Sequence, residues 1–365
     1  MIAITAWGQP ESVQLKRHKG MKKIAIGIDF AKEKFDVTVK NVTNGTSAYG
    51  QYPNTPGGGR SMVAMVRKFA KGIDSSEWLF CGEDTGYYSQ TIARYLTEKG
   101  YFLWLQNPYA IKHSEGDIRR GKDDKADSAA IADYAHRYED KARKYDLPSE
   151  ALEELHLLLT RRDAYVRAKR VIQSGANEIP KRDKQGETVT LIKASTRHLL
   201  KEIDDEIDRL EKRMEEIVAK EEAMQKNYEI LRSFTGIGIV NSMCFITYTY
   251  NFKKFDLNAR KIATYWGVAP FGKDSGKTVH VGPHVSNFCN HWLKAILSNA
   301  ANSAIVWNPI IKPYYERLEK AGKCEGICRN NVKNKIIQTI TAMIRKGEKF
   351  DPEFIFTNKN GATKC

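Results

Sequence analysis

The chain has 365 residues, of which 41% are hydrophobic and 28% are charged, a balance typical of a soluble globular protein. No apolar stretch approaches the about 18–20 residues that a membrane-spanning helix needs, which argues against a membrane protein. The six cysteines are too sparse for a disulfide scaffold, so we expect reduced thiols and a cytoplasmic location.

The formal net charge is +15, and the positive charge is concentrated toward the C-terminal end. Residues 226–365 carry a net charge of +12, whereas residues 146–225 carry −3. A basic segment favours a polyanionic partner, most simply a nucleic acid, because lysine and arginine side chains neutralise phosphates. A merely basic surface would give the same count, so charge alone leaves both interpretations open.

The N-terminal region begins with residues 1–20, which lack a signal-peptide pattern and are expected to be a flexible extension. Runs rich in β-branched and aromatic residues then predict strands at residues 22–30, 34–41, 47–54, 77–83 and 101–106. Helical spacing of apolar residues predicts helices at residues 60–70, 87–99, 109–115 and 124–140. Three successive strands followed by alternating helices and strands predict an α/β domain with a mixed sheet over residues 21–145, in the element order of an RNase H-like fold.

The middle region, residues 146–228, is predicted to be helical with charged faces. An apolar stripe recurs at alternating spacings of three and four residues, formed by Leu200, Ile203, Ile207, Leu210, Met214 and Ile217. Such a stripe predicts either a coiled coil between two chains or the buried face of a bundle within one chain, and the spacing favours neither. Residues 177–188 interrupt the helical pattern and predict the turn of a helical hairpin.

The last region, residues 229–352, is predicted to be mainly α-helical and to be followed by a tail, residues 353–365. Helices are expected at residues 256–268, 288–306, 309–321 and 328–346, with a loop at residues 269–287. The turn at Gly236 and Gly238 could present backbone amides to a phosphate, although a plain buried turn fits these residues equally well.

Four carboxylates occupy positions that suit a divalent-metal site. Asp29 and Glu83 each end an apolar run, and Asp124 and Asp127 are three residues apart, on one face of a helix. Hard cations such as Mg²⁺ prefer oxygen ligands and assist phosphoryl transfer. Acidic residues at strand ends and helix starts are also common without any metal. A basic loop before the helix adds candidate nucleic-acid contacts, Arg119, Arg120 and Lys122.

Several sequence motifs occur in a fixed order through residues 22–352. They are GIDFAKEKFDV at 27–37, GEDTGYYSQ at 82–90, NPYAIKHSEGDIRRGKDDKADSAAIADYA at 107–135, FTGIGIVNS at 234–242, ARKIATYWGVAPFGKDSGKTV at 259–279 and NPIIKPYYERLEKAGK at 308–323. Together they resemble the DEDD transposases of the insertion-sequence family one-ten, which look like RNA-guided serine recombinases and share these motifs with the pilin-gene invertases.

The resemblance implies a RuvC-like domain at residues 21–145, a helical coiled coil at residues 146–228 and a transposase domain at residues 229–352. It implies that the four carboxylates form a catalytic, metal-binding tetrad, and that Ser275 is a nucleophile. It also implies Mg²⁺ (or Mn²⁺) as the cofactor, a non-coding bridge RNA that pairs with target and donor DNA, and assembly as a dimer or tetramer.

The chemistry of Ser275 is consistent with that role. Its hydroxyl is a poor nucleophile until a base removes its proton or a metal polarises it, and the glycine that follows allows a close approach to a nucleic-acid backbone. Candidate phosphate contacts around it are Lys273, Gly276, Lys277 and Lys294. The chain departs from its relatives at residues 280–288, which are poorer in basic residues.

Departures also occur beside the acidic set. Asp123 stands where relatives usually carry Thr, and Ser128 replaces a common Ala. We expect Asp123 and Asp84 to lie outside the metal site.

Two other activities could use similar residues. A nuclease like a Holliday-junction resolvase would use metal-activated water and leave free 5′-phosphate ends, without a covalent intermediate. A pilin-type DNA invertase would share the motifs but invert a resident DNA segment.

Overall fold

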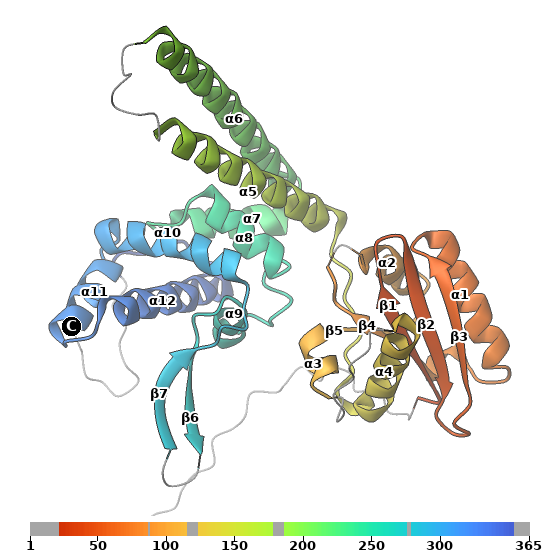
Figure 1. The fold of residues 1–365 in the computed structure, drawn as a ribbon. Coiled ribbons are helices and arrows are strands. Elements are labelled where there is room, and N and C mark those ends of the chain that lie inside the picture. Colours follow the sequence, from red (N-terminus) through yellow and green to blue (C-terminus); the bar gives the residue numbers. More distant parts are fainter. Residues whose placement is uncertain (1–21, 87, 115–122, 178–185, 276–278, 354–365) are drawn as a thin grey trace, which may run out of the picture. The chain divides into compact units, whose positions relative to one another are not determined.

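The computed structural model of this chain describes residues 22–86, 88–114, 123–177, 186–275 and 279–353. The chain divides into two compact units, Met1–Leu147 and Pro148–Cys365, which are described separately below (Figure 1). Within the described ranges, no helix is long and apolar enough to cross a membrane. The expected flexible extension, residues 1–20, lies outside the described residues, as does most of the tail.

The first unit is built on a five-stranded mixed sheet. Its strands are β1 (Ile24–Phe30), β2 (Lys34–Asn41), β3 (Ser47–Pro53), β4 (Trp78–Glu83) and β5 (Leu103–Gln106). The spatial order is β3-β2-β1-β4-β5. The first three strands run antiparallel to one another, whereas β4 pairs in parallel with both β1 and β5. The predicted α/β domain with a mixed sheet is therefore confirmed.

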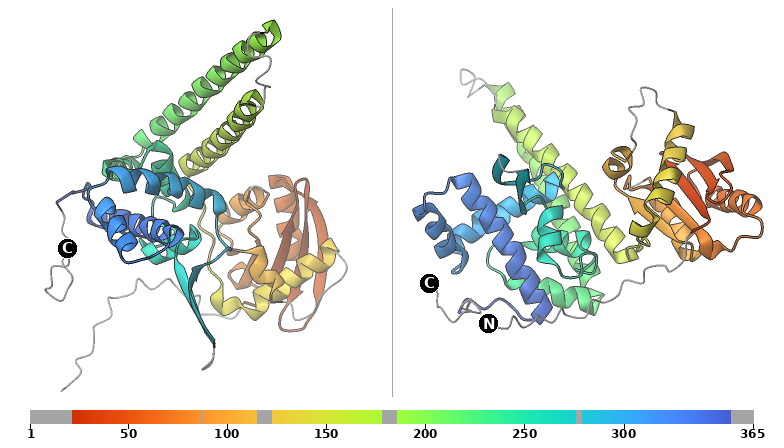
Figure 2. Two further views of the ribbon diagram at one scale, coloured as in Figure 1. Left: turned by 60° about the vertical axis from the view of Figure 1, so that its left-hand side comes forward. Right: turned by 90° about the horizontal axis from the view of Figure 1, so that it is seen from below.

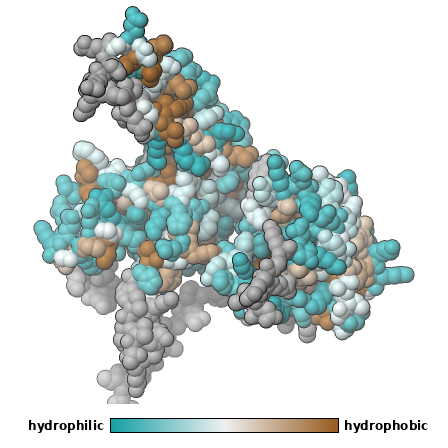
Figure 3. Space-filling view, in the orientation of Figure 1, coloured by the Kyte–Doolittle hydropathy of each residue, from teal (hydrophilic) through white to brown (hydrophobic). Residues whose placement is uncertain are grey.

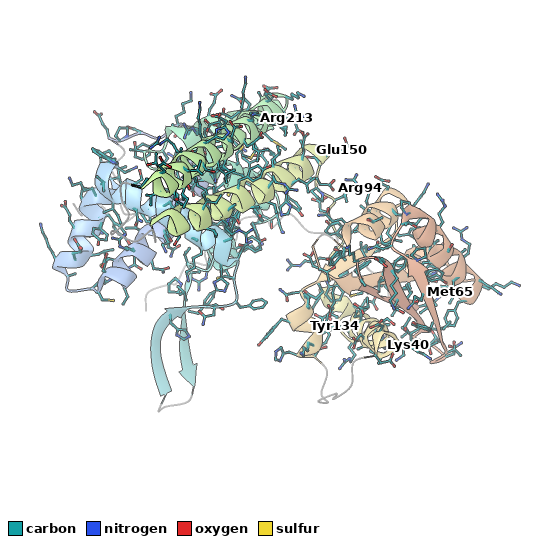
Figure 4. All side chains as sticks on the ribbon, turned by 45° about the horizontal axis from the view of Figure 1, so that its top comes forward. Lys40, Met65, Arg94, Tyr134, Glu150 and Arg213 are labelled. Carbon is teal, nitrogen blue, oxygen red and sulfur yellow. The ribbon has the colours of Figure 1, made fainter. Side chains whose placement is uncertain are left out.

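Alternation along β1 separates the two faces of the sheet. Ile26 and Ile28 pack into the core beneath α1 (Pro56–Phe69) and α2 (Gln90–Glu98). Ala25 faces the other side, where a second core contains Ile131 of α4 (Asp124–Arg137). Met65 of α1 and Tyr134 of α4 thus lie on opposite sides of the sheet (Figure 4). The helical pieces that complete the unit are α3 (Pro108–Lys112), η1 (Ser75–Glu77) and η2 (Glu139–Lys141).

Helix α1 starts earlier than the sequence predicts. Residues 56–59 were expected to precede the helix, but it begins at Pro56, with Thr55 as its N-cap accepting from the amide of Gly58. Gly58 is needed for close packing: a Cβ there would lie 2.0 Å from the carbonyl oxygen of Pro53. The prediction placed the helix start at residue 60, where the apolar pattern begins, whereas the observed start packs against β3 and requires glycine at position 58.

The second unit is mainly helical, as predicted. It opens with a long helical hairpin, α5 (Glu150–Asn177) and α6 (Glu187–Ala219), whose helices run side by side (Figure 2). Ion pairs join the two helices, including Arg162–Glu211 at 2.6 Å and Arg213–Glu154 at 2.7 Å. The remaining helices are α7 (Glu222–Ser233), α8 (Ile239–Tyr248), α9 (Ala259–Tyr265), α10 (His291–Trp307), α11 (Ile311–Lys320) and α12 (Glu325–Lys346).

The apolar stripe of α6 is buried at Ile207, Met214 and Ile217, and its other members are half-buried. Met214 and Ile217 belong to the core of the second unit, so this part of the stripe packs within the chain. Beyond the stripe, the far end of the hairpin carries exposed apolar side chains (Figure 3), with Leu191 of α6 at 70% and Val171 of α5 at 73%, although Val189 is buried. The stripe therefore serves an intramolecular core at its base. A coiled coil between chains stays a prediction.

A two-stranded ribbon replaces the loop that was expected at residues 269–287. It consists of β6 (Pro270–Ser275) and β7 (Val279–Val285), paired antiparallel, and it extends from the helices of the second unit (Figure 1). The alternating Val279, Val281 and Val285 are typical of a strand. The loop prediction was wrong because the glycines, lysines and proline in this segment outweighed that alternation.

Candidate acidic site and serine ribbon

Asp29 and Glu83 are neighbours at one edge of the sheet. The parallel pairing of β1 and β4 ends at Ile28 and Gly82, so Asp29 and Glu83 are the next residues on each strand. By alternation, Asp29 shares its face with Gly27 and Glu83 shares its face with Cys81, which is the face that α4 covers. Both carboxylates are partly buried there.

Helix α4 brings two more carboxylates to the same face. Its N-cap is Asp123, which accepts from the amide of Lys125 at 3.1 Å, so this extra acid has a local structural role. Asp124 and Asp127 each lie one helical turn before a residue that packs on the sheet, and on the same helix face. These residues are Ser128 and Ile131. Ser128 hydrogen-bonds Thr38 at 2.8 Å, and Ile131 is in the core.

Ion pairs show which end of the sheet carries the first turn of α4. The ammonium of Lys34, at the start of β2, lies 3.0 Å from Asp124, and this hydrogen bond raises the pKa of Lys34. Lys40 lies near the other end of β2 (Figure 4), and it pairs with Asp133 later in the helix. Since Lys34 is on the Asp29 side of the strand pair, the first turn of α4 lies at the Asp29 edge.

A fifth carboxylate, Asp36, was missed by the sequence analysis. It lies directly across from Asp29 in the β1–β2 register and is only 2% exposed. Gln51 donates to it at 2.9 Å and the hydroxyl of Tyr49 donates to the same oxygen, which raises the pKa of Tyr49 to about 12. No signal in the sequence marked it, because Asp36 is one of the polar residues that alternate along β2, like Thr38 and Lys40, and its burial depends on hydrogen bonds from β3.

The acidic set has the right chemistry for a hard cation, in an open arrangement. Carboxylate oxygens are the ligands that Mg²⁺ prefers. Among the residues that the structure describes, however, no three His, Cys, Asp or Glu side chains come together as a metal-binding group. Asp29, Glu83, Asp124 and Asp127 thus share one edge of the sheet without forming a closed ligand set. The basic loop with Arg119, Arg120 and Lys122 lies outside the described residues.

Ser275 is the last residue of β6, opposite Val279 of β7. It therefore sits at the far end of the ribbon's pairing, next to residues 276–278, which lie outside the described residues and include Gly276 and Lys277. Lys273 is opposite Val281 in the same ribbon, and only its backbone is described.

Comparison with protein families covers both units. Residues 26–173 match the family of DEDD transposases of the IS110 type, and residues 228–316 match the transposase IS116/IS110/IS902 family. The chain belongs to the IS110 family of transposases. This transposase is accordingly a DNA-cutting enzyme that acts on DNA, and its DEDD family indicates a divalent cation, commonly Mg²⁺. No curated protein is detectably similar to the chain.

Lys294 of the transposase belongs to a cluster of basic side chains. It lies on α10, and its Cδ is 3.6 Å from where a Cβ on Gly267 would be. Burial lowers the pKa of Lys333 on α12, and the charges of Lys294 and Arg329 lower it further. The backbone beside the cluster, which leads into β6, is held by Asn330, whose side chain donates to Val268 at 3.0 Å. Arg329 and Lys333 were missed, although their spacing of four residues was a signal for one helix face.

The turn around Gly236 in the transposase is a packed connection between α7 and α8. Gly236 has a φ of +111°, and a Cβ there would lie 2.8 Å from the Cβ of Ala304 on α10. The side chain of Asn308 donates to the carbonyl of Thr235 at 2.9 Å. Packing therefore accounts for Gly236. Gly238 is exposed at the start of α8, and its predicted contact with nucleic acid stays a prediction.

Proposed function

We propose that this transposase cuts and rejoins DNA through two groups, an acidic metal site in the first unit and a serine nucleophile in the second. The acidic site consists of Asp29, Glu83, Asp124 and Asp127, and the nucleophile is Ser275. The observation that carries the proposal is the common edge at which β1, β4 and the first turn of α4 present their carboxylates. The two family matches support DNA as the substrate.

The first unit, at residues 21–145, is proposed to be RuvC-like, that is, RNase H-like. The support is its topology: three antiparallel strands in succession, then two strands parallel to β1. In a sheet of this kind, residues at the carboxyl ends of the parallel strands β1 and β4 face a common edge. A helix packed across that face can add ligands from its first turn, which matches the position of α4.

The carboxylates of the tetrad would hold Mg²⁺ (or Mn²⁺). Such a cation supplies charge stabilisation to phosphate oxygens in phosphoryl transfer. The protein's own contribution is to bring the acids together on a strand edge and a helix turn.

Ser275 is proposed to attack a DNA phosphodiester. Its Oγ forms a bond to phosphorus, the bond to one DNA oxygen breaks, and the hydroxyl proton passes to a base. The products are a phosphoserine and a DNA end with a free hydroxyl. A second DNA hydroxyl can reverse the step and rejoin strands, since the phosphoserine conserves the energy of the phosphodiester. The position of Ser275 at the far end of the ribbon's pairing suits access to a duplex backbone.

RNA guidance and self-association complete the proposal. A bridge RNA that pairs with target and donor DNA is inferred from the family resemblance, and the net charge of +12 on residues 226–365 suits polyanions of either kind. The exposed apolar far end of the α5–α6 hairpin supports assembly into a dimer or tetramer through a coiled coil.

A metal-dependent nuclease like a Holliday-junction resolvase is the second candidate. The observation in its favour is that the acidic edge lies wholly within the first unit and does not require Ser275 to be complete. An invertase of the pilin type would use the serine and differ only in its DNA target.

The deciding experiment is to trap covalent protein–DNA adducts on nicked substrates with wild type and Ser275→Ala. The proposal expects adducts with wild type and none with Ser275→Ala, while Ser286→Ala, which changes the serine just after β7, keeps them. Adducts that persist in Ser275→Ala would show that the nucleophile is wrong. Cleavage that leaves free 5′-phosphates and never forms adducts would favour the resolvase-like nuclease. RNA that co-purifies and derives from the gene's flank would test RNA guidance.

A further inference from the structure

Lys34 bridges two of the carboxylates at the acidic edge. Its ammonium lies 3.0 Å from an oxygen of Asp124 and 3.7 Å from an oxygen of Asp36. The side chain of Lys34 is 43% exposed, so it can change partner without leaving a buried charge behind. Lys34 starts β2, which fixes its backbone beside Asp29's strand while its long side chain reaches across to α4.

The two partners of Lys34 differ in how firmly they are held. Asp36 is buried within the sheet, where Tyr49 and Gln51 both donate to one of its oxygens. Lys34 approaches its other oxygen. Asp124 is 44% exposed in the first turn of α4. Asp36 is therefore a buried anchor for the ammonium, whereas Asp124 is a partner at the surface.

We infer that Lys34 is the resting counter-ion of Asp124, which it holds in the metal-free protein and gives up, retreating onto Asp36, when a divalent cation binds at the acidic edge. This inference rests on the proposed metal site. It accounts for the ion pair in which an ammonium engages a carboxylate of the acidic edge. Lys34 is thus a positioning residue that competes with the cation for one carboxylate.

Competition between Lys34 and the cation predicts the sign of the change in cation affinity when Lys34 is replaced. An ammonium beside a ligand carboxylate opposes a cation both by occupying the oxygen and by like-charge repulsion. Replacing Lys34 with a neutral side chain removes both effects, so the cation should bind more tightly. General damage to the site would have the opposite sign, because misplaced ligands weaken binding.

The experiment is a calorimetric titration of the full-length protein with Mg²⁺ and with Mn²⁺, in the absence of DNA. Lys34→Gln is expected to bind the cation about two- to fivefold more tightly than wild type, the range for loss of one exposed ion pair. Lys34→Arg, which can still bridge two carboxylates, should stay within about twofold of wild type. Lys40→Gln is the matched control: it breaks a similar β2–α4 ion pair, with Asp133, away from the acidic edge, and should leave the affinity unchanged.

Two further variants separate this inference from the metal site on which it rests. Asp29→Asn and Asp124→Asn should each lose measurable cation binding; if both bind as wild type does, the metal site itself is wrong. If they lose binding but Lys34→Gln binds equally or more weakly than wild type, the site stands and the role of Lys34 is overturned. A second readout is the rise in melting temperature on adding Mn²⁺, which should be larger in Lys34→Gln than in wild type or Lys40→Gln.

Discussion

The carboxylates of the acidic edge and the serine of the β6–β7 ribbon lie on structural elements that are packed very differently. Asp29 and Glu83 stand on two adjacent central strands of a five-stranded sheet, and α4 is pressed onto the same face. Ser275 ends a strand whose pairing partner within its two-stranded sheet is β7 alone. Metal ligands need positions fixed to a fraction of an ångström, which a packed sheet provides. We therefore expect changes at the acidic edge to disturb the packing of the sheet and α4, whereas changing Ser275 should have little effect on folding stability.

The largest expected effect is on DNA strand cleavage. Asp29→Asn removes the charge of a proposed metal ligand, and we expect cleavage to fall on the order of a thousandfold or more, as when a central electrostatic or metal-binding group is lost. Ser275→Ala should abolish strand rejoining to a similar extent. Cation binding distinguishes the two variants, because Asp29→Asn should lose cation binding and Ser275→Ala should retain it.

Gel assays of nicked and rejoined plasmid, together with calorimetry of each variant, measure these effects. A matching melting temperature for Ser275→Ala and wild type would support the view that the ribbon end is structurally dispensable. Loss of cation binding in Ser275→Ala would contradict the separation of the two sites, because it would show that the serine contributes to the metal site.

The next effect concerns how tightly α4 is packed onto β1. A Cβ on Gly27 would lie 2.1 Å from the carbonyl oxygen of Ser128 and 2.3 Å from the amide nitrogen of Ala132. Gly27→Ala must push the helix away, and we expect a loss of about 2–3 kcal/mol in the free energy of unfolding. Since Asp124 and Asp127 move with α4, cation affinity should fall too.

Gly57→Ala is the control for that change. A Cβ there would meet nothing closer than 3.6 Å, and the residue is in the first turn of α1. Alanine should stabilise the protein by about 0.5–1 kcal/mol, because it reduces the freedom of the unfolded chain. Chemical denaturation measures both variants, and a Gly27→Ala protein as stable as wild type would contradict the packing of the acidic edge.

The strands of the first unit could be predicted because their signals are local. β2 spans the predicted residues 34–41, and each of the other predicted strands was found with only its ends trimmed. The ribbon was missed because its alternation is interrupted by Gly282 and Pro283, and the start of α1 because glycine there serves a contact with β3 rather than a turn. The close contact of Gly58 with the carbonyl of Pro53 leaves no periodic signal in the sequence, although the two residues are near each other along the chain.

The sequence suggested candidate residues for the proposed acidic site but not their arrangement. Chain position alone singled out Asp29 and Glu83, since both end apolar runs. Asp36 and Lys34 could not be found this way, because their importance comes from the β1–β2 register and from the lysine's reach to Asp124. Register depends on pairing, which one sequence does not reveal.

A smaller effect should follow from weakening the anchor of Lys34. Asp36→Asn keeps the shape of the side chain but replaces a carboxylate that accepts from Tyr49 and Gln51 within the sheet. We expect a loss of about 1–3 kcal/mol in the free energy of unfolding. Tyr49→Phe removes only one donor to this carboxylate and should cost less. Urea denaturation gives the ranking, and equal losses for the two variants would mean that the charge of Asp36 contributes little.

The smallest expected effect lies in the second unit, at the basic cluster beside the ribbon. Lys294→Gln should weaken DNA binding uniformly across sequences and reduce the slope of log affinity against log salt by about 1, as expected for loss of one phosphate contact. Lys212→Gln, on an exposed position of α6 in the acidic middle region, should leave the slope unchanged. Fluorescence anisotropy over a salt series measures both slopes. If the two variants behave alike, the proximity of Lys294 to Lys333 and Arg329 reflects only a basic surface, and the phosphate contacts of the serine region must come from the ribbon itself.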